Sequence, residues 1–320
     1  MKILIIRLSS IGDIVLTSPV VRCLKKQMPE VEIHFLTKQA FTDVVKNNPY
    51  ISRVLTYEDL DLATLRKENY DFVVDLHHNL RTAKLKQLLK SRSVSFPKLN
   101  IQKWLLVNFK LNFLPDVHIV DRYMETVAKF NIKNDDEGLD YFITPSDELA
   151  IQKIPSGFKE KYIAWVIGAA HATKQLPLDK MISIGQKLKT PVVLLGGKND
   201  TAISSKLKEV LGENVFDACG KFSLNESAAL VKYSSAVITH DTGLMHIAAA
   251  FRKRIISLWG NTVPEFGMYP YLPSRLKENS TILEVQNLRC RPCSKIGFDK
   301  CPKGHFQCMR NIDEAAFVGL

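Results

Sequence analysis

Residues 236–250 read Ala-Val-Ile-Thr-His-Asp-Thr-Gly-Leu-Met-His-Ile-Ala-Ala-Ala, and this stretch decides the fold. Its apolar start is typical of a buried parallel strand, and its small apolar end is typical of a tightly packed helix. Asp241, Thr242 and Gly243 therefore fall where a strand ends and a helix begins. Free backbone N–H groups and the helix dipole favour a phosphate at such a place, which is also where open α/β sheets bind ligands. We interpret the stretch as a nucleotide-type donor site; His246 either contacts the ligand or is a structural histidine.

Strand-like apolar runs alternate with helical patterns along the rest of the chain. This alternation predicts an α/β fold, with parallel sheets covered by helices on both faces. The expected strands are residues 2–6, 32–36, 71–76, 94–96, 162–167, 192–195, 236–239, 255–258 and 282–285. The expected helices include residues 18–27, 178–188 and 224–233.

The 320 residues are enough for two domains, each with its own core. Polar segments at 134–138 and 155–157 are candidate breaks, and a new series of strands opens at 162. We place the boundary near residues 150–158 and expect two similar α/β domains, 1–155 and 156–310, with a cleft between them. Residues 311–320 are expected to form a helix that packs back toward the N-terminal domain.

The chain carries a net charge of +11, and residues 76–133 hold eleven Lys or Arg against three Asp or Glu. This excess either keeps the surface solvated or binds a phosphate-rich partner. Residues 99–114 are apolar and basic, so they form either a helix that touches a membrane surface or one packed on its own domain. No signal peptide or membrane-spanning run is visible, and we expect a cytoplasmic protein.

Polar residues follow the expected strands of the first half. Asp13 closes the loop Leu8-Ser9-Ser10-Ile11-Gly12-Asp13 and either caps the next helix or acts as a general base at the strand's carboxyl end. Other side chains there either form surface salt bridges or bind the phosphates and hydroxyl groups of an acceptor. These acceptor candidates are Ser10, Gly12, His77, Arg81 and Arg122.

The second half repeats this arrangement. Lys174 follows the strand 162–167 and is either an exposed lysine or the cation that neutralises a diphosphate leaving group. Small residues after two strands leave room for a ligand against the backbone. These donor candidates are Gly168, Ala169, Ala170, Gly196 and Gly197.

Four cysteines cluster near the C-terminus with the spacing C-x2-C-x7-C-x6-C: Cys290, Cys293, Cys301 and Cys308. Such a cluster forms a structural zinc site, free thiols or disulfides, and His305 could replace one thiolate. Other chemistries fit poorly, because the chain has no P-loop, no GxGxxG after its first strand and no GxSxG or HExxH motif.

Taken together, these motifs resemble the heptosyltransferase family, glycosyltransferase family 9, of lipopolysaccharide core assembly. The resemblance covers nearly the whole chain and rests on residues 1–13, 75–81, 174–177 and, above all, 241–250. The cysteine-rich tail looks like one seen in part of the family. The chain departs from the family pattern at Leu176, where Trp is common, and at His240, where a hydrophobic residue or Asn is often found.

The resemblance implies a GT-B fold of two Rossmann-like domains facing a cleft, with the acceptor bound by the N-terminal domain and the donor by the C-terminal one. It implies an inverting transfer of a heptose or related sugar from an ADP-activated donor to a lipopolysaccharide core or lipid A-type acceptor, without a catalytic metal ion. Asp13 would be the general base, and Lys174 would stabilise the departing diphosphate. Asp241, Thr242, Gly243 and His246 would hold the donor.

An anionic glycolipid acceptor implies peripheral contact with the cytoplasmic face of the inner membrane, and no nucleic acid is expected as a partner. The competing interpretation is a non-catalytic nucleotide- or nucleic-acid-binding protein on a similar scaffold, which would draw on the net positive charge.

Overall fold

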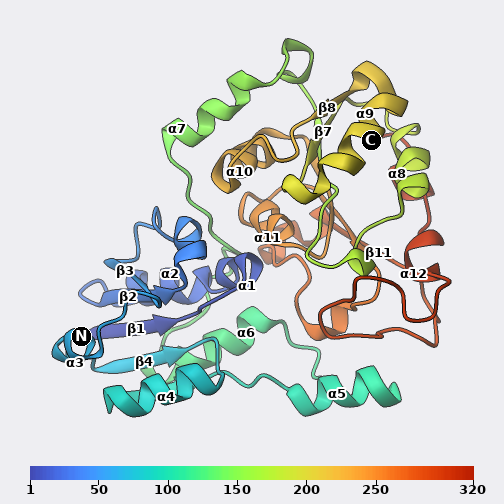
Figure 1. Ribbon diagram of the computed structural model, residues 1–320. Helices are drawn as coiled ribbons and strands as arrows, with labels where there is room; N and C mark the ends of the chain where they lie inside the picture. Colours follow the sequence, from blue (N-terminus) through green and yellow to red (C-terminus); the bar gives the residue numbers. More distant parts are fainter. The chain divides into compact units, whose positions relative to one another are not determined.

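The computed structural model describes all 320 residues, and their contacts divide the chain into two compact units. The first unit consists of Met1–Lys98 and Val117–Phe142, and the second of Leu99–Asp116 and Ile143–Leu320. Each unit contains one parallel sheet with helices packed against it (Figure 1). The predicted α/β class is confirmed. None of the helices is both long and apolar enough to cross a bilayer.

The first unit holds β1 (Lys2–Ile6), α1 (Ile11–Val15), α2 (Ser18–Gln27), β2 (Glu32–Thr37), β3 (Arg53–Thr56), α3 (Leu62–Lys67), β4 (Phe72–Asp75), α4 (Leu80–Leu89), β5 (Arg92–Ser95) and α6 (Ile119–Met124). Its strand order is β3-β2-β1-β4-β5. β1 is apolar from Ile3 to Ile6 because both of its faces are covered, and Ile3 pairs with Ile33 of β2 and Phe72 of β4. α2 packs with α6, and α3 packs with α4.

The second unit holds α5 (Asn100–Phe109), α7 (Pro145–Glu148), β6 (Ile163–Val166), α8 (Leu178–Gly185), β7 (Val192–Leu195), α9 (Thr201–Leu211), β8 (Val215–Asp217), α10 (Leu224–Tyr233), β9 (Ala236–His240), α11 (Gly243–Ala250), β10 (Ile255–Trp259), β11 (Ser280–Glu284) and α12 (Gln307–Arg310). Its strand order is β11-β10-β9-β6-β7-β8. α8 packs with α9 and α10 with α11. From the sheet centre, β6 to β8 run toward one edge and β9 to β11 toward the other. Because crossovers between parallel strands are right-handed, α8 and α9 lie on one face of the sheet and α10 and α11 on the other.

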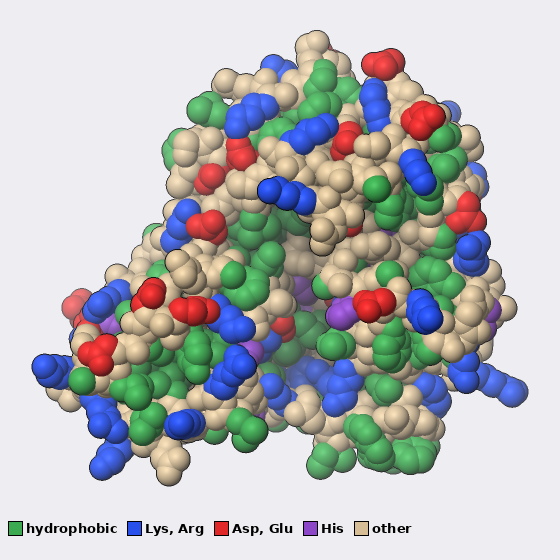
Figure 2. Space-filling model, in the orientation of Figure 1, with side chains coloured by type: hydrophobic (Ala, Val, Ile, Leu, Met, Phe, Trp, Pro, Cys, Tyr) green, Lys and Arg blue, Asp and Glu red, His purple; other side chains and the backbone are tan.

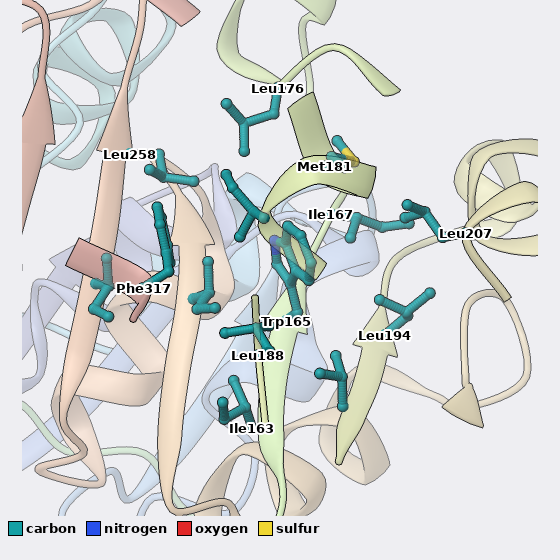
Figure 3. Close-up of a cluster of buried hydrophobic side chains, with 14 of the residues drawn as sticks. Ile163, Trp165, Ile167, Leu176, Met181, Leu188, Leu194, Leu207, Leu258 and Phe317 are labelled. Carbon is teal, nitrogen blue, oxygen red and sulfur yellow. The ribbon is translucent and has the colours of Figure 1, made fainter. Parts of the chain in front are cut away.

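The core of the second unit is built around Trp165 of β6, which is fully buried (Figure 3). Ile163, Leu188 and Leu194 pack in the same cluster. Phe317 is also fully buried there, although it lies near the C-terminal end of the chain. The cluster therefore joins the sheet, the helices on one of its faces and the last residues into one packed body.

The limits of the compact units differ from the predicted domains. Residues 143–155, expected in the first domain, pack with the second unit because Glu148 accepts hydrogen bonds from Lys232 and Tyr233 of α10. α5 also joins the second unit, although its neighbours in the chain belong to the first. Residues 311–320 contain a short 3-10 turn, Ala315–Phe317, and pack on the second unit, where Lys189 and Thr190 donate backbone hydrogen bonds to the Leu320 carbonyl oxygen. They contain this 3-10 turn in place of the expected helix.

Candidate functional site

In the first unit, polar side chains gather where the strand order changes direction, between β1 and β4. Arg7 follows β1, is buried, and donates from Nη1 to the carbonyl oxygen of Leu76, which follows β4. Nη1 also lies 3.1 Å from the hydroxyl of Tyr123 in α6. Arg7 therefore ties together the two loops that leave the sheet at this point, the usual place for a ligand in an open α/β sheet.

Asp13 stands beside Arg7 in the first turn of α1. Its Oδ1 lies 2.6 Å from Arg7 Nη2, and its Oδ2 accepts from the Ser10 hydroxyl at 2.8 Å and from the Ser10 backbone N–H at 3.2 Å. Burial alone would raise the pKa of Asp13, but the Arg7 charge and the hydrogen bonds from Ser10 outweigh it and lower the pKa. Asp13 is thus an ionised carboxylate that both caps the helix and keeps a negative charge at the strand end.

His77 lies near this ion pair, on the loop after β4. Burial, followed by the positive charges of Arg7 and Lys98, lowers the pKa of His77 to about 4, so its ring is neutral at pH 7. The loop is held by Asp75, a fully buried carboxylate that accepts backbone hydrogen bonds from His77 at 3.0 Å and His78 at 2.7 Å. Asp75 also pairs with Lys86 of α4 at 2.9 Å. The sequence analysis did not single out Asp75, although an acid at a strand's last residue is the signal that could have found it.

The remaining acceptor candidates are placed differently from one another. Gly12 is buried in α1, directly before Asp13. Arg81 is exposed in the first turn of α4. Arg122 is buried, and its Nη1 donates to the Pro97 carbonyl oxygen at 3.4 Å. The structure thus brings Ser10, Asp13 and His77 together around Arg7, while Arg122 contacts the protein's own backbone.

In the second unit, the donor candidates meet at the corresponding place, between β6 and β9. Lys174 follows β6, Asp241 follows β9, and their Nζ and Oδ2 atoms are 2.6 Å apart. The same Oδ2 accepts from the hydroxyl of Thr262 at 3.0 Å. Thr262 follows β10, so three adjacent strands each supply one polar group. Thr262 was not predicted, because only the strand order shows that the loop after β10 lies beside Asp241.

α11 begins at Gly243, directly after Thr242. No side chain caps this helix start, and the Thr242 hydroxyl lies 3.3 Å from that of Thr239. The first backbone N–H groups of the helix are therefore left for another acceptor, as an anion site requires. His246 is buried one turn into the helix.

His240, the last residue of β9, fixes the loop that carries Lys174. Its Nε2 accepts a hydrogen bond from the Leu176 backbone N–H at 3.0 Å, and complete burial lowers the pKa of its ring to about 4. His240 and Leu176 are the two positions at which this chain departs from the family pattern. The two departures are therefore in direct contact, two residues from Lys174.

The glycines after β6 and β7 make room for a side chain of the protein. A Cβ on Gly168 would lie 2.2 Å from Asp200 Oδ2, and one on Gly196 would lie 2.8 Å from the same atom. That oxygen accepts from the Gly197 backbone N–H at 2.8 Å. Ala169 is half-buried and accepts from the Gln175 side chain, while Ala170 is exposed. Asp200, which was not predicted as a site residue, occupies the space that these glycines leave.

The spacing of the cysteine-rich tail left a zinc site, free thiols or disulfides open, and the structure has free thiols. All six cysteines are free thiols, and no group of three or more His, Cys, Asp or Glu side chains is arranged to hold a metal ion. Cys290 Sγ lies 3.9 Å from His305 Nε2, which is a contact between two potential ligands and not a tetrahedral set. The segment is held instead by Arg291, which pairs with Glu284 at 2.8 Å and donates to the Gly260 and Val285 carbonyl oxygens.

Two Rossmann-like units, each with polar groups at the point where its strand order reverses, are the arrangement expected of a GT-B glycosyltransferase. The sequence model described as glycosyltransferase family 9 (heptosyltransferase) matches residues 62–300. The chain belongs to this family, and it is a glycosyltransferase.

Named relatives support the assignment over most of the chain. Lipopolysaccharide heptosyltransferase 1 of Campylobacter coli is 26% identical over 289 residues, 82% of this chain and 84% of the relative. Lipooligosaccharide heptosyltransferase 2 of Haemophilus influenzae is 25% identical over 313 residues, 89% of each chain.

Solved structures agree with the fold. A glycosyltransferase of family 9 from Veillonella parvula superimposes with a TM-score of 0.77 at 22% identity, covering 99% of this chain and 94% of that one. The Escherichia coli ADP-heptose lipopolysaccharide heptosyltransferase II gives 0.72 at 18% identity, covering 97% and 98%. The Escherichia coli heptosyltransferase WaaC, solved with ADP, gives 0.66 at 20% identity, covering 88% and 92%. The predicted GT-B fold is confirmed.

Proposed function

We propose that this glycosyltransferase moves a heptose from an ADP-activated donor to an anionic glycolipid of the lipopolysaccharide core, with inversion at the anomeric carbon. The observation that carries the proposal is the contact of Lys174, Asp241 and Thr262 at the sheet's switch point. The names of the Campylobacter and Haemophilus relatives support the sugar and the acceptor class. The WaaC structures with ADP and with ADP-2-deoxy-2-fluoro heptose support the donor.

The second unit would bind the donor. A diphosphate at the start of α11 would receive the uncapped N–H groups near Gly243 and the positive end of the helix dipole. Asp241 holds Lys174 beside this place, so the ammonium group would neutralise the negative charge that grows on the leaving diphosphate. Thr242 and His246 would contact the diphosphate or the sugar.

The first unit would activate the acceptor. The acceptor hydroxyl oxygen forms a bond to the anomeric carbon while the bond from that carbon to the diphosphate oxygen breaks, and Asp13 takes the hydroxyl proton. The lowered pKa of Asp13 keeps the carboxylate ionised at pH 7, so that it can accept a proton, and also makes it a weaker base than a free carboxylate. Ser10, Gly12, His77, Arg81 and Arg122 remain candidates for acceptor binding or for shaping that site.

Neither step needs a metal ion, since Lys174 and the helix start supply the positive charge, and we expect activity to persist in a chelator. A lipid-linked acceptor would place the protein at the cytoplasmic face of the inner membrane.

A donor screen tests the proposal. The protein is incubated with ADP, ADP-heptose, UDP-glucose and GDP-mannose, and the unfolding temperature is measured. A ligand at one hundred times its Kd stabilises the folded state by about 2.7 kcal/mol, so ADP-heptose should raise the unfolding temperature and the uridine and guanosine sugars should not. Stabilisation by UDP-glucose alone would overturn the donor assignment. Salt-sensitive binding of random nucleic acid with no response to any nucleotide would overturn the enzyme proposal.

A further inference from the structure

An apolar surface stands out on α5 and the residues that follow it. Ile101 is 73% exposed, Phe109 58% and Phe113 63%, and Trp104 and Leu111 are also exposed. The Trp104 and Phe109 rings meet edge to face with their centroids 5.3 Å apart. Figure 2 shows hydrophobic side chains gathered at the lower right, where Figure 1 places α5. A contiguous exposed patch of large apolar residues marks an interaction site.

The opposite face of α5 is anchored, so the apolar residues cannot simply turn inward. Leu106 is buried in a cluster with Val263 and Phe266. Lys103 Nζ lies 5.8 Å from the centre of the Phe266 ring, and Lys110 Nζ donates to the Pro292 carbonyl oxygen at 2.6 Å. These contacts fix which side of the helix faces solvent.

The cysteine-rich segment extends the same surface. Lys295 Nζ donates to the Asn100 carbonyl oxygen at 3.4 Å, which joins the segment to the first turn of α5. Ile296 and Phe298 on either side of Gly297 are exposed, with Ile296 63% accessible. We call residues 99–114 and 289–303 together the α5 surface.

The α5 surface is strongly basic. It carries one acidic residue, Asp299, and its Arg291 is neutralised by the ion pair with Glu284. Apart from Lys103 and Lys110, which contact the anchored face, the surface has four exposed basic side chains: Arg289, Lys295, Lys300 and Lys303. Two copies of such a surface would repel each other, whereas an anionic partner would be attracted. Aromatic rings beside Lys and Arg are the composition that binds at a lipid–water interface.

We propose that the α5 surface docks on an anionic lipid bilayer. The rings of Trp104, Phe109 and Phe113 enter the interface between head groups and acyl chains, and the surrounding Lys and Arg contact the lipid phosphates. The contact is peripheral because α5, at ten residues, is far too short to cross a bilayer. The inference assigns a surface to the membrane location that the proposed function implies, and its test does not depend on transferase activity.

The full chain is mixed with vesicles of phosphatidylcholine alone or of phosphatidylcholine with phosphatidylglycerol, and bound protein is measured by flotation. Trp104 reports its own surroundings, because the other two tryptophans, Trp165 and Trp259, are already buried. We expect binding and a blue shift of the emission with the anionic vesicles only, and a loss of binding as salt rises.

The Phe109→Ser/Phe113→Ser variant should bind the anionic vesicles about tenfold more weakly. The matched control is Leu149→Ser/Val210→Ser, which removes two equally exposed apolar side chains elsewhere on the second unit and should bind like the wild type. Circular dichroism checks that both variants are folded. Equal binding by the two double variants, or equal binding to neutral and anionic vesicles, would overturn the proposal. Self-association that Phe109→Ser/Phe113→Ser abolishes, without any vesicle binding, would show that a second copy covers the surface.

Discussion

The carboxylate of Asp13 and the guanidinium of Arg7 form an ion pair, with 2.6 Å between Oδ1 and Nη2, at the carboxyl end of β1. Arg7 also holds the loop after β4 through the Leu76 carbonyl oxygen. One buried arginine therefore sets both the charge of the proposed base and the position of the neighbouring loop. A base held this way is oriented before any acceptor arrives, which favours rapid proton transfer.

Replacing Asp13 with Asn should stop sugar transfer while leaving donor binding intact. The amide keeps the shape of the side chain but cannot take a proton, so kcat should fall by about 10²–10⁴-fold. Turnover is measured with saturating donor, and donor binding by the shift in unfolding temperature. The control is Asp43→Asn, an exposed aspartate of the first unit paired with Lys46, which should leave turnover unchanged. Normal turnover by Asp13→Asn would remove this residue from the mechanism.

Lys174 and Asp241 should show a measurable energetic coupling. Each of the single variants Lys174→Met and Asp241→Asn leaves the other charged side chain unpaired. The site is largely shielded from water, since the side chain of Lys174 is 15% exposed and that of Asp241 13%. The double variant should therefore be more stable than the sum of the single losses implies, by about 0.5–3 kcal/mol. The free energy of unfolding of the wild type and the three variants, measured by chemical denaturation, gives this coupling energy. The exposed pair Lys208 and Glu213 is the control, and its coupling should be near zero. Additive losses at Lys174 and Asp241 would mean that the pair does not form in solution.

His77 and His240 should titrate near pH 4 in the folded protein, because burial lowers the pKa of each ring to about 4. In the unfolded chain both bind a proton near pH 6.5, so the unfolded state binds more protons between pH 6.5 and 4. The free energy of unfolding should therefore fall as the pH drops through this window. NMR titration of the ring protons measures the two midpoints, and His77→Gln or His240→Gln assigns them. A midpoint near 6.5 for His240 would contradict its burial against Leu176.

Two of the six thiols, Cys290 and Cys301, should react readily in the native protein, whereas burial raises the pKa of Cys293 and slows its reaction. Cys290, Cys293 and Cys301 are half-buried, whereas Cys23, Cys219 and Cys308 are buried. Burial raises the pKa of Cys219 and of Cys308 to about 12, so both stay protonated and unreactive. A thiol reagent should modify about two sites rapidly in the native protein and all six after unfolding. Metal analysis of the same sample should find no stoichiometric zinc, and about one zinc per chain with protected thiols would favour the zinc site instead.

The secondary structure was predictable where the residues carry a strong local signal. β1, β7, α2 and α10 have the predicted bounds, and α10 begins with a capping box between Ser223 and Glu226. β3 and β8 were missed because these short edge strands are only partly buried and lack an apolar run. The limits of the compact units were missed for another reason. Contacts such as that of Glu148 with α10 join segments far apart in the chain, and no local pattern reveals them.

The candidate site was predictable in its parts but not in its assembly. Asp241 and Lys174 were identified from strand ends and motif, and the structure adds that they touch. Thr262 reaches Asp241 from the loop of a neighbouring strand, so it becomes visible only once the strand order is known, whereas Asp200 bonds to Gly197 on its own loop. The cysteine spacing left a zinc site, free thiols and disulfides open, because spacing alone does not orient four thiols, and the structure has free thiols.

In the sequence, α5 lies between β5 and α6 of the first unit. In the structure it belongs to the second unit, where its Leu106 packs against Val263 and Phe266. A single cleavage after Phe142 would consequently free a fragment that carries α5 without the residues that shelter Leu106. Such a fragment would expose Leu106 and would tend to aggregate. We therefore expect that a single cleavage does not separate the two units, and that limited proteolysis yields nicked protein whose fragments stay associated.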